Sequence, residues 1–302
     1  MKFTQNPHVT GFRFDLLNFS QQIEQSIFSR EVLYIFFTKP YILFLFKYII
    51  PMHYLSVGAM FKNESNILRE WIEHYLFHGV DHFYLIDDNS SDDFLSILEP
   101  YLFRGLVTLF QHTQPWDYYL GRQKDMYNHF ILPKLHETQW LVMIDLDEYL
   151  WSPMSIDLKE PLRQCMHIGQ IQVKNNLFGS NGHIQQPKSV VQSFTKRSKT
   201  MNEGGIKYIV NTNFQFKELT IHHAFFQDPA YEKTHFLIIG APYFCLNHYS
   251  SQSREYWEKN KCVRGDGDHW RVRTPADFNL VDLNDVEDLD LYEQNQSLFL
   301  CK

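Results

Sequence analysis

The sequence lacks the signals that mark several common kinds of site. No GxGxxG motif follows its first apolar strand, and no GxxxxGKT-type motif occurs, so the backbone cradles of a Rossmann dinucleotide site and of a P-loop are missing. No two cysteines form a CxxC pair, which argues against a zinc ribbon or a thioredoxin-like motif. The cysteines neither demand nor exclude disulfides, and we expect a reducing cytosol. They are Cys165, Cys245, Cys262 and Cys301.

An excess of basic charge is also missing. The net charge is −7, and residues 275–302 hold seven acids against one base, so the remainder is close to neutral. Without a basic field over the whole chain, nucleic acid is not an expected partner. The composition is 44% hydrophobic and 16% aromatic, which supports a large folded core and argues against disorder.

Long uninterrupted apolar runs are scarce. Met1–Ser20 has no continuous apolar stretch of the kind found in signal peptides. The most apolar segment, residues 31–52, is interrupted by Lys39, Pro40 and Lys47, whereas a membrane span needs about 20 apolar residues. Two interpretations stay open for this segment: helices packed on the main domain, or an interfacial anchor with aromatic side chains at the bilayer boundary.

What is present is an alternation of strands and helices. Apolar runs predict strands, and segments with apolar residues at helical spacing predict the helices between them. This order is typical of an α/β fold with a mainly parallel sheet and helices on both faces. We therefore predict an N-terminal helical appendage over residues 1–53 and one catalytic domain over 54–302. The expected strands are 54–61, 82–88, 106–112 and 140–150, and the expected helices are 66–79, 94–105 and 121–136.

Polar side chains follow three of these strands, namely at residues 62–64, 87–90 and 145–148. In parallel sheets ligands bind beyond the carboxyl ends of the strands, so these groups are expected to share one rim. Asp145 and Asp147 form a DxD triplet, and on an extended segment both carboxylates would face the same way. Two hard oxygen donors suit Mg²⁺ or Mn²⁺, although a solvated strand end or a helix cap would use the same residues.

Several ordered segments resemble glycosyltransferase family 92 and the related family-2-like bacterial glycosyltransferases. They span about Leu55 to Tyr292 and include "FKNESNILREWIEHYLFHGVDHFYLIDDNSSDD", "WLVMIDLDEYL", "NNLFGSNGH", "LNHYSSQSREYWEKNKCVRGD" and "DLNDVEDLDLY". The resemblance implies a GT-A fold and an inverting transfer of a hexose from a UDP-sugar to a glycan or glycolipid acceptor. It also implies Mn²⁺ or Mg²⁺ as cofactor.

The same resemblance assigns roles to individual residues. Contacts to the nucleotide sugar fall on Lys62, Asn63, Glu64, Asp87 or Asp88, Gln123, Lys259 and Arg264. Metal contacts fall on Asp145, Asp147 and His248. The sequence does not single out the general base. The candidates are His183, Glu148, Asp266 and Asp268, and we predict His183 and Asp266 as the catalytic residues.

The chain departs from the family pattern in places. Gln192 or Ser193 stands where the family often has an acid, and Asn211-Thr212 replaces an Arg-Pro pair. We expect no membrane anchor of the kind found in animal members, which favours a bacterial-style enzyme of lipopolysaccharide or capsule synthesis. We expect it in the cytoplasm, peripheral to the inner face of the membrane.

Other functions are compatible with the same sequence features. The same scaffold could serve a non-catalytic protein that binds nucleotide sugars or glycans, or a metal-dependent phosphohydrolase with a nucleophilic aspartate. His74 and His78 share the spacing of a zinc pair but lack a third ligand, so we predict that they lie on a helix surface. For His222 and His223, one ring could enter the cleft, but a structural histidine is the expected role.

Overall fold

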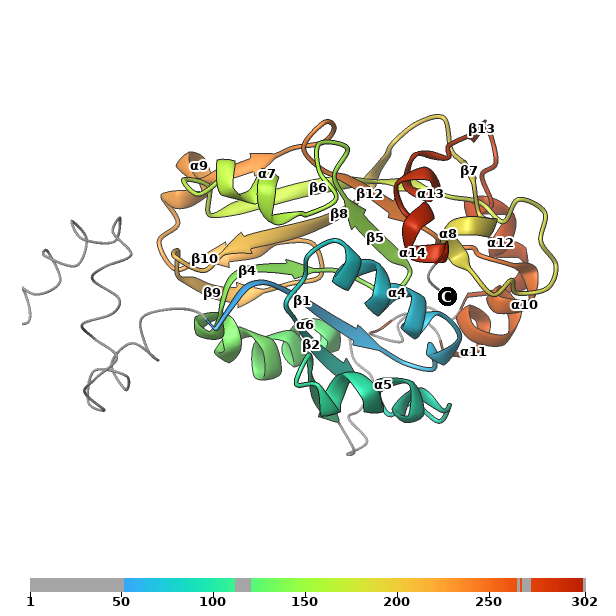
Figure 1. Ribbon diagram of the computed structural model, residues 1–302, viewed down its shortest axis with the longest axis horizontal. Coiled ribbons are helices and arrows are strands. Elements are labelled where there is room, and N and C mark those ends of the chain that lie inside the picture. The colour runs from blue at the N-terminus through green and yellow to red at the C-terminus, as the bar shows by residue number, and fades with distance from the viewer. Residues whose placement is uncertain (1–51, 112–120, 265–266, 268–272, 301–302) are drawn as a thin grey trace, which may run out of the picture. The chain divides into compact units, whose positions relative to one another are not determined.

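The computed structural model describes residues 52–111, 121–264, 267 and 273–300 of the 302-residue chain (Figure 1). The proposed appendage lies outside these ranges except for Met52 and His53, so its role stays a prediction. Within the described ranges, no helix has the length and apolar character needed to cross a membrane.

The strands of the described chain are β1 (His53–Phe61), β2 (His82–Asp87), β3 (Val107–Gln111), β4 (Thr138–Met143), β5 (Glu148–Trp151), β6 (Gln170–Leu177), β7 (Lys196–Arg197), β8 (Asn202–Asn211), β9 (Phe216–Leu219), β10 (Ala224–Phe226), β11 (Phe236–Ile238), β12 (Cys245–His248) and β13 (Val286–Glu287). The longer helical segments are α4 (Ser65–Phe77), α5 (Phe94–Phe103), α6 (Arg122–Met126) with a π-helix (Tyr127–Ile131) and a 3-10 helix (Leu132–Glu137), and α7 (Lys159–Gln164). The shorter ones are α8 (Val190–Ser193), α9 (Tyr231–Thr234), α10 (Arg254–Tyr256) with a π-helix (Trp257–Lys261), α11 (Cys262–Arg264), a 3-10 helix (Pro275–Asp277), α12 (Phe278–Val281), α13 (Asp290–Gln294) and α14 (Gln296–Leu300).

The main sheet runs in the order β3-β2-β1-β4-β8-β6-β12-β5, and β11 pairs with the first part of β6, on the edge that β12 uses further along the strand. The pairs among β3, β2, β1 and β4 are all parallel, as are those of β6 with β12 and β11. β8 is antiparallel to β4 and β6, and β5 is antiparallel to β12. The predicted α/β class with a mainly parallel sheet is therefore confirmed.

Helices cover both faces of the parallel half of the sheet. On one face Phe83 and Leu85 of β2 pack in a core with side chains of α4 and α5. On the other face Tyr84 and Ile86 pack with Met126 of α6 and with the π-helix that follows. Successive side chains of a strand point to opposite faces, so one apolar strand supplies both cores. The predicted alternation of strands and helices over residues 54–137 is confirmed.

The strand predicted over residues 140–150 is interrupted. β4 ends at Met143, and β5 begins only at Glu148 as the antiparallel partner of β12. Between them the chain turns: Glu148 N donates to Asp145 O at 3.2 Å, and the Glu148 carboxylate accepts from Asp145 N at 3.1 Å. The expectation that Asp145 and Asp147 project from one extended segment is therefore wrong, because these hydrogen bonds close a turn around them.

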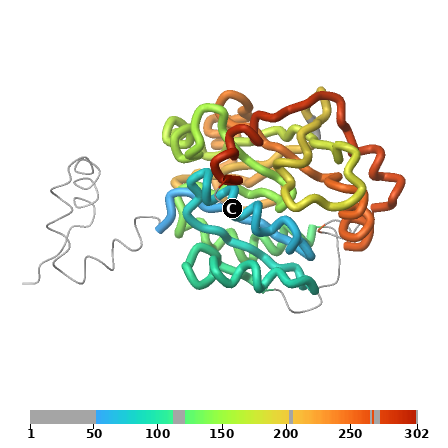
Figure 2. The backbone as a smooth tube through the Cα atoms, turned by 45° about the vertical axis from the view of Figure 1, so that its right-hand side comes forward, coloured from blue at the N-terminus to red at the C-terminus, as the bar shows by residue number. Residues whose placement is uncertain are grey.

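The acidic C-terminal residues 275–300 do not form a single helix. They contain α12, α13, α14 and the short strand β13, and their end lies beside α4 (Figures 1 and 2). Asn295 is fully buried there, and it lies within hydrogen-bond distance of His78 Nε2 (2.9 Å) and His74 Nδ1 (3.1 Å). The prediction that His74 and His78 are surface residues is wrong, since both are fully buried by this contact.

Candidate functional site

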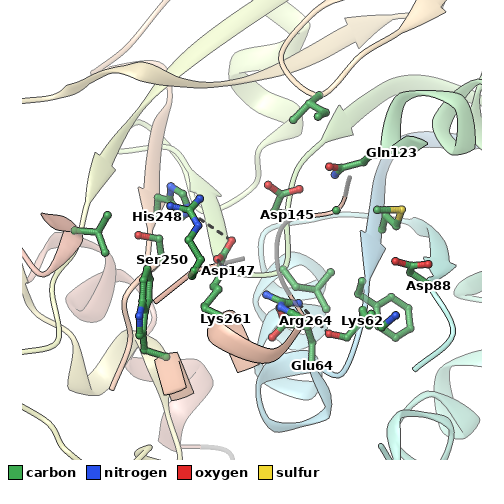
Figure 3. Close-up of a pocket in the computed structure, with 18 of the residues that line it drawn as sticks. Lys62, Glu64, Asp88, Gln123, Asp145, Asp147, His248, Ser250, Lys261 and Arg264 are labelled. Atoms are coloured by element: carbon green, nitrogen blue, oxygen red, sulfur yellow. Dashed lines mark hydrogen bonds and ion pairs between the residues drawn. The ribbon is translucent and has the colours of Figure 1, made fainter. Parts of the chain in front are cut away.

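A cavity of about 470 Å³ opens at the carboxyl ends of β1, β2, β4, β6 and β12 (Figure 3). Phe61, Asp88, Asp145, Leu177 and His248 each lie at or just beyond the end of one of these strands and line the cavity. The volume lies within the range of small-molecule sites in proteins. The predicted meeting of polar strand ends at one rim is therefore found, and it gathers both acidic and basic side chains.

Glu64 is held in the wall by the helical segment 254–264. Its carboxylate forms an ion pair with Arg264 and accepts a 2.8 Å hydrogen bond from the Tyr256 hydroxyl. Arg264 also donates to the carbonyl oxygen of Lys62 at 2.9 Å. Burial alone would lower the pKa of Arg264, but the Glu64 carboxylate raises it, so the guanidinium stays charged. The pair ties the loop after β1 to the C-terminal part of the chain.

Asp88 and Gln123 are fixed in a similar way on the same side of the cavity. Asp88 is 2% exposed and accepts from Arg122 Nη1 at 2.9 Å. Gln123 Nε2 donates to the hydroxyl of Tyr127 at 2.6 Å, one turn along the same helix. A residue that aligns a nucleotide must itself be held, and these contacts keep both side chains in place.

Asp145 is paired with a lysine that the sequence argument passed over. Lys207, in β8, donates to Asp145 Oδ2 at 2.7 Å and lies 3.6 Å from Glu148 Oε2, with only 5% of its side chain exposed. Burial would lower the pKa of Lys207, but the two carboxylates raise it well above its usual value. A charged lysine therefore lies behind the DxD turn.

Asp147 is paired with two basic side chains. Lys261 Nζ donates to its Oδ2 at 2.6 Å, and His248 Nε2 lies 3.5 Å from its Oδ1 (Figure 3). Burial by itself would raise the pKa of Asp147, but Lys261 and His248 hold it well below the usual range. The carboxylate is therefore ionised although only 4% of the residue is exposed.

Several predicted site residues lie elsewhere. The described residues that line the cavity do not include Asn63, Asp87, Lys259 or His183. Asn63 has a positive φ of 54°, and its Oδ1 accepts from Ser91 N at 2.7 Å, so it shapes the loop after β1. Asp87 likewise caps a turn by accepting from Ser90 N at 2.8 Å.

Lys259 and His183 are exposed. Lys259 pairs with Glu255 at 2.7 Å on the outer side of its helical segment. The ring of His183 meets Phe194 edge-on, with 5.6 Å between centroids. Asp266 lies outside the described residues, as does Asp268, and their proposed roles stay predictions.

Of the pair His222 and His223, of which one ring could enter the cleft, it is His222 that lines the cavity, where a structural role was expected. It follows β9, lines the cavity and is exposed to it. Its Nδ1 lies 2.8 Å from the carbonyl oxygen of Ile206. A carbonyl can only accept, so Nδ1 carries the proton and Nε2 keeps a lone pair in the neutral ring. Burial, and then the charge of Lys207, lower the pKa of His222, which favours that neutral form.

The donor set fits a divalent cation that binds together with a nucleotide. Within the described part of the chain, no group of three or more His, Cys, Asp or Glu side chains could hold an ion on its own. Two carboxylates are present, however, and each already binds an ammonium group that stands in for a cation. Mg²⁺ commonly takes one or two carboxylates and completes its shell with phosphate oxygens and water. Asp145 and Asp147 are therefore suited to such an ion, provided that the lysines make room.

The arrangement combines three chemical functions in one cavity. Lys62, Lys261, Arg264 and Arg273 bring positive charge to its lining. The DxD carboxylates offer hard oxygen ligands, and His222 offers a nitrogen lone pair. The Ser250 hydroxyl lines the same space, is buried, and has no hydrogen-bond partner among the described residues. Such a site can bind a polyanion and accept a proton beside it.

The sequence matches known proteins over most of its length. The model of glycosyltransferase family 92 matches residues 52–274. A glycosyltransferase family 92 protein of Oryza sativa subsp. japonica is 26% identical over 212 residues, which covers 68% of this chain and 34% of that protein. One from Ricinus communis is 25% identical over 150 residues, covering 48% and 26%. The chain thus matches about a third or less of the length of these relatives.

Solved structures were also found to be similar. Residues 1–349 of TarS from S. aureus in complex with UDP-GlcNAc have a TM-score of 0.42 and 15% identity, covering 81% of this chain and 70% of that one. Glucosyl-3-phosphoglycerate synthase from Mycobacterium tuberculosis, in complex with Mn²⁺, UDP and glucosyl-3-phosphoglycerate, has a TM-score of 0.26 and 17% identity, covering 40% and 43%. These TM-scores are too low for the likeness to support a conclusion about the site.

Proposed function

The chain belongs to glycosyltransferase family 92, and from this membership we propose that it transfers a hexose from a UDP-sugar to a hydroxyl group of a glycan acceptor, with inversion at the anomeric carbon. The observation that carries the proposal is the cavity at the carboxyl strand ends, where the DxD carboxylates and a set of basic side chains meet. A nucleotide diphosphate needs both kinds of group around it.

In this reaction the acceptor oxygen forms a bond to the anomeric carbon, and the bond from that carbon to the β-phosphate oxygen breaks. UDP leaves with the bonding electron pair, so negative charge grows on the diphosphate. Lys62, Arg273 and Lys261 line the cavity where this charge would be received. Positive groups placed in advance at a developing charge stabilise the transition state more than the ground state.

The acceptor hydroxyl must lose a proton as it attacks. Among the described residues, we assign this proton to His222 Nε2, because the hydrogen bond of Nδ1 to Ile206 leaves Nε2 as the acceptor. Glu148, an earlier candidate, is a poorer choice. It is 1% exposed and already accepts from Asp145 N at 3.1 Å behind the turn. General-base catalysis of this kind contributes about 10²- to 10⁴-fold to a rate.

Asp145 and Asp147 would hold Mn²⁺ or Mg²⁺, and the ion, when bound, would neutralise part of the diphosphate charge. The other ligands would come from the diphosphate and from water, since the described residues offer no third carboxylate, cysteine or histidine in a suitable group. His248 Nε2 lies 3.5 Å from Asp147 Oδ1, beside the position of the ion and the diphosphate, and the family resemblance gives it a contact to one of these two.

The finer parts of the proposal concern the acceptor and the location. We propose a cell-surface glycan or glycolipid, as in lipopolysaccharide or capsule synthesis, and an enzyme peripheral to the cytoplasmic face of the membrane. Their support is the family resemblance and the apolar composition of residues 31–52.

The test combines binding with turnover. Titration calorimetry with UDP and Mn²⁺ measures nucleotide binding, and release of UDP from a panel of UDP-hexoses, with and without candidate acceptors, measures transfer and hydrolysis. We expect Asp147→Asn to lower UDP release by about 10²- to 10³-fold. UDP binding without turnover of any donor would instead indicate a binding protein. Phosphate release from simple esters, without preference for a sugar donor, would indicate a phosphohydrolase.

A further inference from the structure

Four acids of the cavity wall each pair with a basic side chain. The pairs are Glu64 with Arg264, Asp88 with Arg122, Asp145 with Lys207, and Asp147 with Lys261. A carboxylate that is almost fully buried cannot stay ionised without such a partner. A divalent cation that takes the Asp147 oxygen held by Lys261, or the Asp145 oxygen held by Lys207, must therefore displace an ammonium group.

Three of the four basic side chains have further polar partners. Arg264 also bonds the carbonyl oxygen of Lys62, Arg122 also bonds that of Gly267 at 3.2 Å, and Lys207 also lies near Glu148. Lys261 differs, because Asp147 is its sole hydrogen-bond or ion-pair partner within the described ranges. Lys261 Nζ also lies 5.9 Å from the centre of the Tyr256 ring, so opening the Lys261–Asp147 pair breaks the fewest hydrogen bonds and ion pairs, but not the fewest contacts of every kind.

The position of Lys261 suits movement of the side chain alone. The segment that carries it is anchored on both sides: Asn260 Nδ2 donates to the carbonyl oxygen of Asn63 at 3.0 Å, and Arg264 binds Glu64. The backbone is thereby fixed, while the lysine ends in a compact ammonium group on a flexible four-carbon stem. Lys261 lines the same cavity as Lys62 and Arg273, so its ammonium group can leave Asp147 without leaving the site.

We propose that Lys261 occupies the cation position at Asp147 while the cavity holds no donor, and that it transfers to the diphosphate when a divalent cation and the nucleotide bind together. The proposal rests on the proposed function. It makes two predictions of opposite sign for one side chain: Lys261 competes with the metal ion when nucleotide is absent, and it supports the nucleotide when the ion is present.

The experiment measures Mn²⁺ and UDP binding separately. For the unmodified protein, calorimetry and the electron paramagnetic resonance of free Mn²⁺ should show weak Mn²⁺ binding that strengthens when UDP is added. In Lys261→Met we expect Mn²⁺ alone to bind at least tenfold more tightly, and UDP at saturating Mn²⁺ to bind at least tenfold more weakly. Lys233→Met, an exposed lysine in α9 outside the cavity lining, is the control and should change neither affinity.

A second variant distinguishes loss of the proposed role from a folding defect. Lys261→Arg keeps the positive charge but can bind Asp147 through two parallel hydrogen bonds. We expect it to fold normally and to bind Mn²⁺ at least tenfold more weakly than the unmodified protein. The two variants should therefore move Mn²⁺ affinity in opposite directions.

Three results would overturn the proposal while leaving the proposed function intact. Unchanged Mn²⁺ and UDP affinities in both Lys261 variants would show that Lys261 affects the binding of neither ligand. Weaker UDP binding with unchanged Mn²⁺ binding would make Lys261 a simple phosphate contact. Weaker binding of both ligands in Lys261→Met would make it a structural support. If the unmodified protein bound no UDP with Mn²⁺ or Mg²⁺, the proposed function itself would fail, and this inference with it.

Discussion

The two sides of the cavity are built differently. On the side of β1 and β2, Glu64, Asp88 and Gln123 are each fixed by a protein partner close by. On the opposite side, His222 keeps a lone pair directed away from its one hydrogen bond, and Lys261 has a single hydrogen-bond or ion-pair partner. The fixed side defines the shape of the site, whereas the other side holds the groups that can exchange partners. We infer that binding geometry and reactivity are divided between them.

The largest expected effect comes from removing a partner on the fixed side. Arg264→Met would leave the Glu64 carboxylate buried without its cation, and breaking a buried pair in this way costs about 3–5 kcal/mol of unfolding free energy. Denaturant unfolding followed by fluorescence measures the loss. The double variant Glu64→Gln, Arg264→Met should recover much of it because no charge is left unpaired. An equal loss in the single and double variants would mean that the charge pair does not hold this side in place.

The next largest effect is expected on the side of the cavity that holds His222 and Lys261, which we call the exchanging side. His222→Gln should lower the rate of UDP release by about 10²-fold and leave the affinity for UDP unchanged, because the residue is proposed to take a proton and not to bind the donor. In the unmodified protein, kcat/KM for the proposed transfer should fall below pH 6.5 as His222 is protonated, and the variant should lose this decrease.

His223→Gln is the matched control for that experiment. His223 is adjacent in the chain, but its Nε2 lies 3.2 Å from Glu232, so it serves a structural contact. We expect this variant to keep the normal rate. A similar loss of rate in both variants would assign the effect to the loop and not to a base.

A smaller effect is expected at the amino ends of the parallel strands, far from the cavity along β2. Burial, and then the charge of His53, lower the pKa of His82 from 6.5 to about 4. The unfolded chain therefore binds this proton more readily between those pH values, so the folded state loses stability as the pH falls from 6.5 toward 4. One such group contributes at most about 1.4 kcal/mol per pH unit.

The measurement for His82 is the thermal unfolding temperature between pH 8 and pH 4. The unmodified protein should lose more stability than His82→Gln over the lower half of this range. The ring of His82 also faces Thr108 at 2.8 Å, and the charges of Glu137 and Lys134 act on it, so both variants must be compared at one ionic strength. Parallel curves for the two proteins would rule out the histidine as the cause.

The smallest effect is expected for Lys259→Met. Lys259 is exposed and pairs with Glu255 across one helical turn, and such surface pairs contribute little to stability. UDP affinity should stay within twofold of the unmodified value. A large loss of UDP affinity would support the nucleotide contact that the family resemblance assigned to Lys259. Lys259 and Lys261 would then both act on the nucleotide.

The sequence predicted the parallel half of the sheet well because its signals are local. The apolar runs of β1, β2 and β4 and the helices between them follow each other directly, and Gly79, with a φ of 86°, ends α4 as its position suggested. The DxD residues could be found for the same reason, since they stand at a strand end.

The exchanging side could not be predicted in the same way. Lys207 and Asp145 are separated by 62 residues, and Lys261 and Asp147 by 114, so these pairs depend on how distant strands meet. Two signals were nevertheless present. A lysine inside the apolar strand "IKYIVN" needs a buried partner, which marks Lys207. Residues three apart share a helix face and residues two apart do not, so Lys261 lies with Arg264 and Lys259 points elsewhere.

The long separation between Asp147 and Lys261 has a consequence for the newly made chain. A ribosome adds about 5–20 residues per second, so on the order of ten seconds pass between the synthesis of the aspartate and that of the lysine 114 residues later. Until then the DxD turn has no counter-charge from the helical segment 254–264, and the cavity lacks the basic side chains of that segment. The proposed donor site is therefore completed late in translation.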